Sequence, residues 1–423
     1  MSAAARAGEL LRLSWRYLWS RPLASALNLL LLTLGLAAVV LVLLVSEQVD
    51  RGFERDVQGI DLVVGAKGSP LQLILAGVFH IDVPPGNIAL QDFEALQRNP
   101  LVAQAIPLSL GDSFAGYRIV GTTPEYPAHY GAAWAAGRVW IRPMEAVLGA
   151  TVAGAMRRAA VDAGRTTLGS GPGGLLGQSF VGTHGLAPGG EAHGDNPYTV
   201  VGVLQPCGCV LDRLVLTATE SVWKVHESAQ ADDPDDLEVL RQEREVTLAL
   251  VRYRSPLAAV TLPRAINSGT PMQAASPAVE ITRLVGLLGV GADVLRAFGG
   301  VLLGVAALSV FIALWNAVRE RRADLAMLRM LGAPPARVGG LLLCEALWLA
   351  LIASLLGLAC GHLLAEGVGR LLAARNAMPV TGWVWLPGEW AVPALAAALA
   401  VLAALLPALQ AYRVDAGELL GRP

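Results

Sequence analysis

The residues of this chain best suited to metal or redox chemistry are two cysteines separated by one residue. Cys207 and Cys209 stand in "QPCGCVLD" between two strand-like runs, which predicts a tight connection. Together with His184 or His193 from the preceding loop, two thiolates would offer soft donors to zinc or copper(I). A disulfide across so short a loop would be strained. If the two cysteines have a chemical role, we therefore expect them to be free thiols. The alternatives are a disulfide, which an oxidising compartment would favour, and a plain turn, because the Cys-x-x-Cys spacing of a structural zinc site is missing.

Sequence signatures of other enzymatic chemistry are not found. The chain has no GxxxxGK[ST] loop, so we expect no ATP hydrolysis by the P-loop route in these residues. "GSGPGG" at residues 169–174 matches a GxGxxG string, but no strand leads into it, and we interpret it as a loop. Neither a Ser/His/Asp set nor a pair of catalytic carboxylates is recognisable. We therefore expect a non-catalytic protein that binds no cofactor of its own.

The composition indicates a membrane protein. Hydrophobic residues make up 54% of the 423 residues and charged residues 16%, and the mean hydropathy is +0.52. Four stretches hold the roughly 20 apolar residues that cross a bilayer, namely 23–45, 298–318, 339–365 and 390–412. The net charge of -2, without any basic block, argues against a partner that is a nucleic acid. Membrane lipids are the expected surroundings.

The arginines predict the orientation of the chain. They gather before the first apolar stretch, between the second and third, and after the fourth. We therefore expect both termini in the cytoplasm and residues 46–297 on the opposite side. The predicted fold is an integral membrane α-helical protein with four transmembrane helices and a large mixed α/β extracytoplasmic domain between helices 1 and 2.

Patterns outside the spans predict further elements. Residues 1–22 alternate arginines with leucines and tryptophans, which favours an amphipathic helix in the headgroup plane, a topogenic flank being the alternative. The segments that flank the external domain, 46–57 and 277–297, are expected to continue the first two spans as helical stalks. In the domain itself we expect strands over 61–66, 117–123, 198–204, 211–218 and 246–253, and helices over 90–100 and 142–164.

Small and ionisable residues inside the spans favour helix packing over ion conduction. Gly300 with Gly304 and Gly357 with Gly361 form GxxxG pairs, which let helix backbones approach closely. Charged residues are not found deep in the centre of a span, which argues against a proton relay. His362, near the outer end of the third span, is assigned to the interface rather than to a ligand set.

The segment over residues 319–361 carries a family resemblance. It reads "RERRADLAMLRMLGAPPARVGGLLLCEALWLALIASLLGLACG", with a charged run, a Leu-Gly-Ala turn and an "LLxEAL" entry into the next helix. This segment resembles the FtsX-like permease segment of ABC transporters of the MacB and LolC/LolE type. "LLPALQAYRVDAGELL" resembles the closing helix and cytoplasmic tail (413–423) of the same family, and "LLGQSFVGTHGLAPGGEAHGDNPYTVVGVL" resembles a MacB-type periplasmic core domain.

The resemblance implies how the parts of the chain are used. Residues 46–297 would be the periplasmic core, and 298–412 the permease domain with a coupling helix over 319–331. That helix would contact a separate ABC ATPase subunit, which binds ATP and Mg. The residues carried over to this contact and its turn are Arg319, Arg321, Arg322, Leu328, Arg329, Met330 and Gly332.

The implied function is transport in the bacterial inner membrane. A homodimer of this chain would pass the motion of two ATPase subunits to its periplasmic domain, a mechanism called mechanotransmission, and so export or extract an amphipathic, lipid-linked or peptide-like substrate. The alternative is an FtsX-like relay that activates an extracytoplasmic hydrolase, which would be a periplasmic partner protein. In the first case a small ligand would change the ATPase rate. In the second case only a hydrolase would change it.

Overall fold

The fold was taken from a computed structural model, which describes residues 3–20, 22–162, 171–185, 195–230, 234–320, 327, 330, 333–374 and 380–412. The described residues form two compact units. Residues 50–286 make up the α/β unit. The helical unit contains residues 3–49, 287–374 and 380–412.

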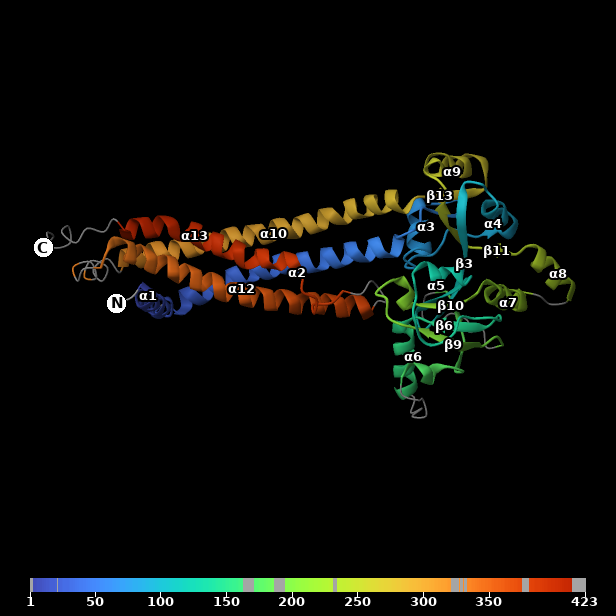
Figure 1. The fold of residues 1–423 in the computed structure, drawn as a ribbon, viewed down its shortest axis with the longest axis horizontal. Helices are drawn as coiled ribbons and strands as arrows, with labels where there is room; N and C mark the ends of the chain where they lie inside the picture. The colour runs from blue at the N-terminus through green and yellow to red at the C-terminus, as the bar shows by residue number, and fades with distance from the viewer. Residues whose placement is uncertain are drawn as a thin grey trace. The chain divides into compact units, whose positions relative to one another are not determined.

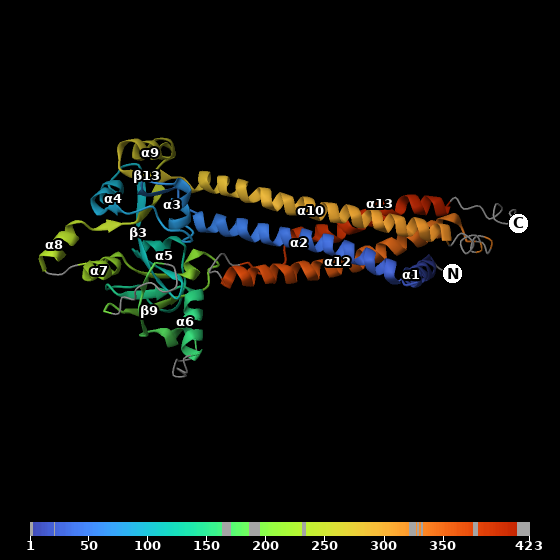
Figure 2. The same cartoon turned by 180° about the vertical axis from the view of Figure 1, so that it is seen from behind.

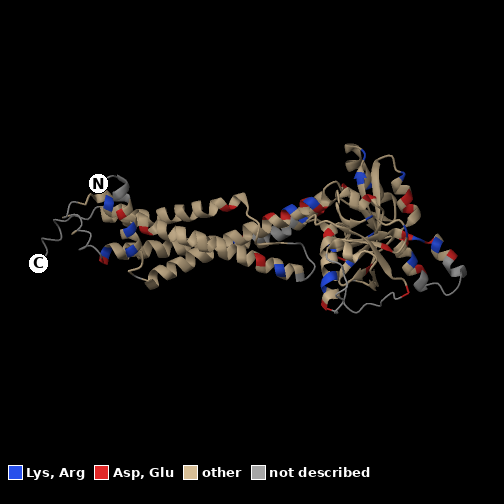
Figure 3. Cartoon of the chain, turned by 60° about the horizontal axis from the view of Figure 1, so that its bottom comes forward, with Lys and Arg blue, Asp and Glu red and all other residues tan. Residues whose placement is uncertain are grey.

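The helical unit is built from long apolar helices. Its elements are α1 (Ala3–Leu18), α2 (Pro22–Val57), α10 (Pro277–Glu320), α12 (Pro335–Ala374), the short 3-10 helix η3 (Pro387–Trp390) and α13 (Ala391–Tyr412). Within the described residues, α2, α10, α12 and η3–α13 each contain a stretch long and apolar enough to cross a membrane. These helices run side by side (Figures 1 and 2), and Figure 3 shows their middle portions almost free of charged residues. This fits the four apolar stretches of the sequence.

Three of these helices are longer than a bilayer requires. Helices α2, α10 and α12 contain 36, 44 and 40 residues. At 1.5 Å per residue they extend over about 54, 66 and 60 Å, against a hydrocarbon core of about 30 Å. Each therefore continues beyond the apolar layer as unbroken helix. Their common core consists of leucine, valine and alanine, including Leu36, Val40, Val310, Ala346 and Ala353.

The α/β unit is organised by one mixed sheet. Its strand order is β13-β1-β12-β3-β4-β10-β6-β9-β5, with β7 added beside β9 and β8 beside β3. Most neighbours are antiparallel, whereas β4 with β10 and β6 with β9 are parallel. Strands β2 and β11 form a separate pair. The strands are β1 (Leu62–Ala66), β2 (Ile88–Ala89), β3 (Val102–Phe114), β4 (Tyr117–Thr122), β5 (Trp134–Gly137), β6 (Glu145–Leu148), β7 (Ser179–Phe180), β8 (Thr183–His184), β9 (Tyr198–Leu204), β10 (Leu214–Ala218), β11 (Glu245–Val246), β12 (Leu248–Tyr253) and β13 (Met272–Ala275).

Helices of the α/β unit cover this sheet, and α7 packs on β3 and β4. The helices are α3 (Pro70–Gly77), α4 (Leu90–Gln97), α5 (Glu125–His129), α6 (Ala150–Asp162), α7 (Thr219–Gln230), α8 (Pro234–Gln242) and α9 (Pro256–Gly269), with 3-10 helices η1 (Pro172–Leu175) and η2 (Val210–Arg213). The mixed α/β class predicted for this part of the chain is therefore correct.

The helix predicted over 142–164 is wrong in its first part. Residues Glu145–Leu148 form strand β6, which lies between β10 and β9, and α6 begins only at Ala150. Ala146, Val147 and Leu148 are completely buried. Gly149 lies between the two elements. Glycine is required there because a side chain would collide with the backbone of Leu211 and Asp212. Burial within the sheet outweighs the helical preference of the sequence.

Candidate coupling site

One end of the helical unit brings together the elements around the predicted coupling helix. Helix α10 ends at Glu320 and α12 begins at Pro335, and α1 and the last turns of α13 lie at the same end (Figures 1 and 2). A proline suits the first helical position because its missing N–H has no partner there in any case. The Arg337 N–H donates to the Pro334 carbonyl at 2.9 Å, which closes the turn into α12.

The structure describes part of the predicted coupling helix. Arg319 lies in the last turn of α10 and is exposed. Met327 and Met330 have helical backbone, and their exposed fractions are 57% and 55%. The other residues predicted for this contact lie outside the described ranges: Arg321, Arg322, Leu328, Arg329 and Gly332.

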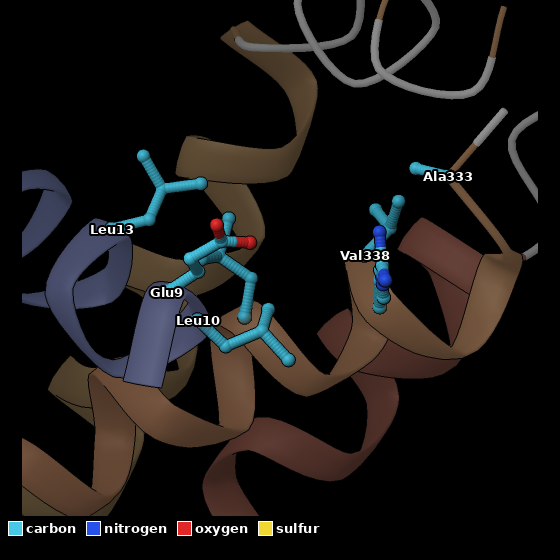
Figure 4. Close-up of a pocket in the computed structure, with 7 residues that line it drawn as sticks. Glu9, Leu10, Leu13, Ala333 and Val338 are labelled. Atoms are coloured by element: carbon cyan, nitrogen blue, oxygen red, sulfur yellow. The ribbon is translucent and has the colours of Figure 1, made fainter. Parts of the chain in front are cut away.

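An apolar groove lies beside this turn, between α1 and the start of α12. Its volume is about 210 Å³. Figure 4 shows side chains from the two helices facing this space. Two of the lining residues, Glu9 on α1 and Arg337 on α12, carry opposite charges at a mostly apolar surface. The lining residues are Glu9, Leu10, Leu13, Ala333, Arg337, Val338 and Leu341.

Helix α1 is held against α12 by aromatic side chains. The rings of Trp15 and Trp348 meet edge to face with centroids 5.1 Å apart, and the Trp348 Nε1–H donates to the Leu11 carbonyl at 3.4 Å. At the α1–α2 bend, the Ser25 hydroxyl donates to the Leu18 carbonyl at 2.5 Å. Sequence reasoning did not find this packing, because tryptophans among arginines fit a membrane interface equally well. Leu11 and Trp15 remain partly exposed, as interfacial side chains would.

A polar network ties the helices together at the other end of the helical unit. The His362 Nε2 lies 2.7 Å from Oε2 of the fully buried Glu389, whose Oε1 accepts the Leu386 N–H at 2.7 Å. Gln48 on α2 donates to the Thr381 carbonyl at 2.9 Å and accepts the Thr381 N–H at 3.0 Å. His362, predicted only as interfacial, therefore belongs to a network that fixes the chain before α13 to α2 and α12.

The two predicted GxxxG pairs have different surroundings. A Cβ at Gly357 would lie 2.7 Å from the Leu36 Cβ, and one at Gly361 would lie 2.5 Å from the Val40 Cβ. Both glycines therefore allow α12 to approach α2 closely. Gly300 and Gly304 on α10 face open space, since apart from α10 itself no described atom lies within 4 Å of a Cβ built there.

The cysteine pair does not form the thiol site expected from the sequence. Cys207 and Cys209 are joined by a disulfide, with their Cα atoms 5.1 Å apart. Sulfurs in a disulfide offer no thiolate to a metal, so the prediction of two free thiols disagrees with the structure. The Asp212 carboxylate accepts the Cys207 and Gly208 N–H groups at 3.0 and 2.7 Å and so supports this turn.

The histidines named with the cysteines also lie elsewhere. His184 is in strand β8, where its ring nitrogen lies 3.5 Å from a carboxylate oxygen of Asp112. Among the described residues, potential metal ligands gather as Asp112, His184 and His226, without a cysteine. His193 lies outside the described ranges.

Comparison with known proteins adds two family matches. The family described as "MacB-like periplasmic core domain" matches residues 25–269, and the one described as "FtsX-like permease C-terminal" matches residues 296–416. No curated protein sequence matches this chain.

Solved structures similar to the chain include a periplasmic region and an extracellular domain of two other proteins. One is the periplasmic region of MacB from Actinobacillus actinomycetemcomitans, at 13% identity and a TM-score of 0.33, covering 54% of this chain and 95% of that one. Another is the extracellular domain of the noncanonic ABC-type transporter YknZ from Gram-positive bacteria, at 14% identity and a TM-score of 0.29, covering 51% and 98%.

Proposed function

Because this chain belongs to the family of MacB-like and FtsX-like ABC transporter permeases, we propose that it couples ATP hydrolysis in a separate ATPase subunit to motion of its α/β unit outside the cytoplasm. The cargo is an amphipathic, lipid-linked or peptide-like molecule at the outer face of a bacterial inner membrane. Both termini and the segment between α10 and α12 face the cytoplasm.

The observation that supports this proposal most is the arrangement at the α10–α12 turn. A short connection joins two unbroken helices of 44 and 40 residues. It carries the exposed Met327 and Met330 and adjoins the groove lined by α1. Exposed apolar side chains on a helix face are suited to anchor a partner. A partner that moves this connection therefore moves both helices.

The contacts within the helical unit favour movement of whole helices over local bending. At Gly357 and Gly361 the backbone of α12 packs directly against α2, so the two helices cannot shift past each other without a collision. At the opposite end, the hydrogen bonds between Gln48 and Thr381 hold α2 to the chain before α13. A displacement applied at one end of a helix is therefore passed on to the other end.

The test is a coupling assay on the full chain in lipid nanodiscs with the ATPase that co-purifies from native membranes. Met327→Asp and Met330→Asp place a charge on the proposed contact face. Loss of a buried apolar anchor costs about 2 kcal/mol or more of binding free energy, so we expect ATPase association to weaken about 30-fold and stimulated hydrolysis to fall accordingly. Binding is measured by biolayer interferometry, and hydrolysis by phosphate release.

Val161→Asp is the matched control. Val161 lies at the end of α6 and is similarly exposed, at 61%, in the α/β unit. This variant should bind the ATPase and stimulate hydrolysis like the unaltered chain. Normal association of the two methionine variants would refute the coupling site. A hydrolysis rate that responds only to an added hydrolase, and not to lipid-linked or peptide ligands, would replace transport by the relay function.

A further inference from the structure

Three potential metal ligands from distant parts of the sequence meet in the α/β unit. Asp112 lies on β3, His184 on β8 and His226 on α7. One ligand atom from each lies within 4.8 Å of the other two. The two imidazole rings stand edge to face with centroids 5.7 Å apart, and His184 Nδ1 lies 3.5 Å from Asp112 Oδ1.

The register of β3 and β8 explains the first two positions. Asp112 and His184 are directly opposite each other in this antiparallel pair, so their side chains share one face of the sheet. Two hydrogen bonds of Gly185, the residue after His184, hold this register. The Gly185 N–H donates to the Gly111 carbonyl at 2.9 Å, and the Ser113 hydroxyl donates to the Gly185 carbonyl at 2.5 Å.

The third ligand comes from α7, which packs on β3. Gly111, next to Asp112, leaves space for it: a Cβ at position 111 would lie 3.2 Å from His226 Nε2. Such a separation is tighter than ordinary van der Waals contact between carbon and nitrogen. A side chain at position 111 would therefore push the His226 ring out of its present position.

Burial and charge make the group suitable for a cation. Asp112 is almost completely buried, and a buried carboxylate is tolerated in proteins when it is paired or coordinates a metal.

We propose that the α/β unit binds one divalent transition-metal ion of the zinc class through Asp112, His184 and His226. Two imidazoles and one carboxylate are preferred ligands of Zn²⁺, whereas Ca²⁺ and Mg²⁺ prefer sites made only of oxygen atoms. The site goes beyond the coupling function and is independent of it.

The present separations require a small closure around the ion. Ligand atoms in a tetrahedral zinc site with bonds of 2.0–2.1 Å are about 3.3 Å apart. The described group spans up to 4.8 Å. His184 can supply the movement, because its side chain is 58% exposed and so has room to rotate.

Three protein ligands leave one coordination position for an outside donor. His184 and His226 line a cavity of about 350 Å³, whereas Asp112 is not part of its lining. The open position therefore faces this cavity, where it takes water or an oxygen of an anionic group. In the same cavity, Arg244 forms an ion pair with Glu227 at 2.7 Å and lies over the Trp223 ring at 4.7 Å. Arg244 and Trp223 thus give the cavity a cationic and aromatic wall.

The experiment is a metal titration of the purified full chain in detergent after removal of bound metal with a chelator. Zn²⁺ is titrated in competition with a chromophoric chelator, and bound metal is counted by inductively coupled plasma mass spectrometry. Loss of a group that only supports a ligand already weakens metal binding 10–100-fold. We therefore expect one zinc per chain, bound about tenfold or more weakly by His184→Gln, His226→Gln and Asp112→Asn. Visible absorption of bound Co²⁺ should likewise disappear in these variants.

Two control variants identify the ligands. His129→Gln alters a histidine of the same unit that bonds to the Gln58 carbonyl at 2.9 Å, and the double change Cys207→Ser with Cys209→Ser removes the sulfurs. Both should keep the affinity of the unaltered chain. His184 is exposed, so its variant retains the fold and remains informative should Asp112→Asn unfold the unit. The proposal would be overturned if the chain did not bind stoichiometric zinc. It would also be overturned if His184→Gln and His226→Gln bound zinc with the affinity of the unaltered chain.

Discussion

His80 is a buried histidine whose ionisation opposes folding of the α/β unit. Its Nε2 lies 2.9 Å from the Tyr126 hydroxyl, and its backbone has a positive φ of 55°. Its pKa is lowered well below the ordinary 6.5, firstly because burial removes water from the charged imidazolium and secondly because Arg118 and Arg213 are positively charged. The folded protein therefore keeps His80 neutral.

This depressed pKa predicts a loss of stability in acid. Below about pH 6.5 the unfolded chain takes up a proton at His80 that the folded chain does not, so the free energy of unfolding falls as the pH decreases. The slope contributed by this single group is about 1.4 kcal/mol per pH unit. His80→Asn removes the titrating group and tolerates the positive φ. We expect a lower melting temperature at pH 7.5 but a weaker dependence on pH between 6.5 and 5.

The measurement is thermal unfolding of the full chain in detergent, followed by intrinsic fluorescence across this pH range. Tyr126→Phe serves as the control, because it removes the hydrogen bond to His80 but leaves the titrating ring in place. It should destabilise the chain and keep the acid dependence. If the melting temperature of His80→Asn depended on pH as strongly as that of the unaltered chain, another group would cause the loss of stability in acid.

Residue types alone did not identify the metal ligands. The sequence drew attention to Cys207 and Cys209, which are close along the chain, and to His184. In the structure His184 instead meets Asp112, because β3 pairs with a strand of only two residues whose register leaves no mark on the sequence. His226 could have been suspected only from the position of α7 on β3, which depends on packing of the whole unit.

At the scale of elements, periodicity and hydropathy were sufficient for the long helices. Runs of about 20 apolar residues predicted the membrane helices, and runs of β-branched residues predicted strands such as β4 and β9. The order of the sheet could not be derived in the same way, because β1 pairs with β12 and β13 from the far end of the domain. Strand β6 was missed because alanine, valine and leucine in a row suit a buried strand and a helix alike.

The contact of α12 with α2 gives a prediction for Gly361. A methyl group there would lie 2.5 Å from the Val40 Cβ, which is closer than real side chains approach. Overpacking of this kind costs about 1–3 kcal/mol. Gly361→Ala should therefore lower the melting temperature of the full chain in detergent and weaken contact between the helices.

Gly367→Ala on the same helix is the matched control, since a Cβ there meets no described atom within 4 Å apart from α12 itself. Alanine is favoured over glycine in a helix by about 1 kcal/mol, so this variant should melt at the same or a slightly higher temperature. Both are measured by differential scanning fluorimetry. Equal melting temperatures of the two variants would show that α12 and α2 do not pack closely at Gly361.

At the scale of the whole molecule, the family followed from three stretches of the sequence, whereas the cargo did not. The charged run before the Leu-Gly-Ala turn pointed to an FtsX-like permease, and the matches over 25–269 and 296–416 agree with this identification. The cargo has no comparable signature, because an outer domain can bind many ligands with the same fold. The groove between α1 and α12 was equally hidden, since it arises from two helices more than 300 residues apart.

The open face of α10 leads to a prediction about assembly. Gly300 and Gly304 have no described neighbour from another helix within 4 Å of a built Cβ, and Val301, Val305 and Leu308 on the same helix are exposed. Small residues at this spacing permit close approach of a second helix in a membrane. Homodimers with twofold symmetry are the commonest oligomers. We therefore expect two copies of this 44.2 kDa chain to pair through α10 and to bind two ATPase subunits.

Native mass spectrometry of the complex released from nanodiscs tests this assembly. The unaltered chain should give the mass of two permease and two ATPase chains. Gly304→Leu places a bulky side chain on the pairing face, so it should shift the population to single permease chains while the melting temperature of the helical unit is retained. Gly367→Leu, at an open position on α12, should leave the dimer intact. A dimer that persists in Gly304→Leu and dissociates in Gly367→Leu would move the interface to α12, and a monomer that binds the ATPase and supports transport would exclude the homodimer.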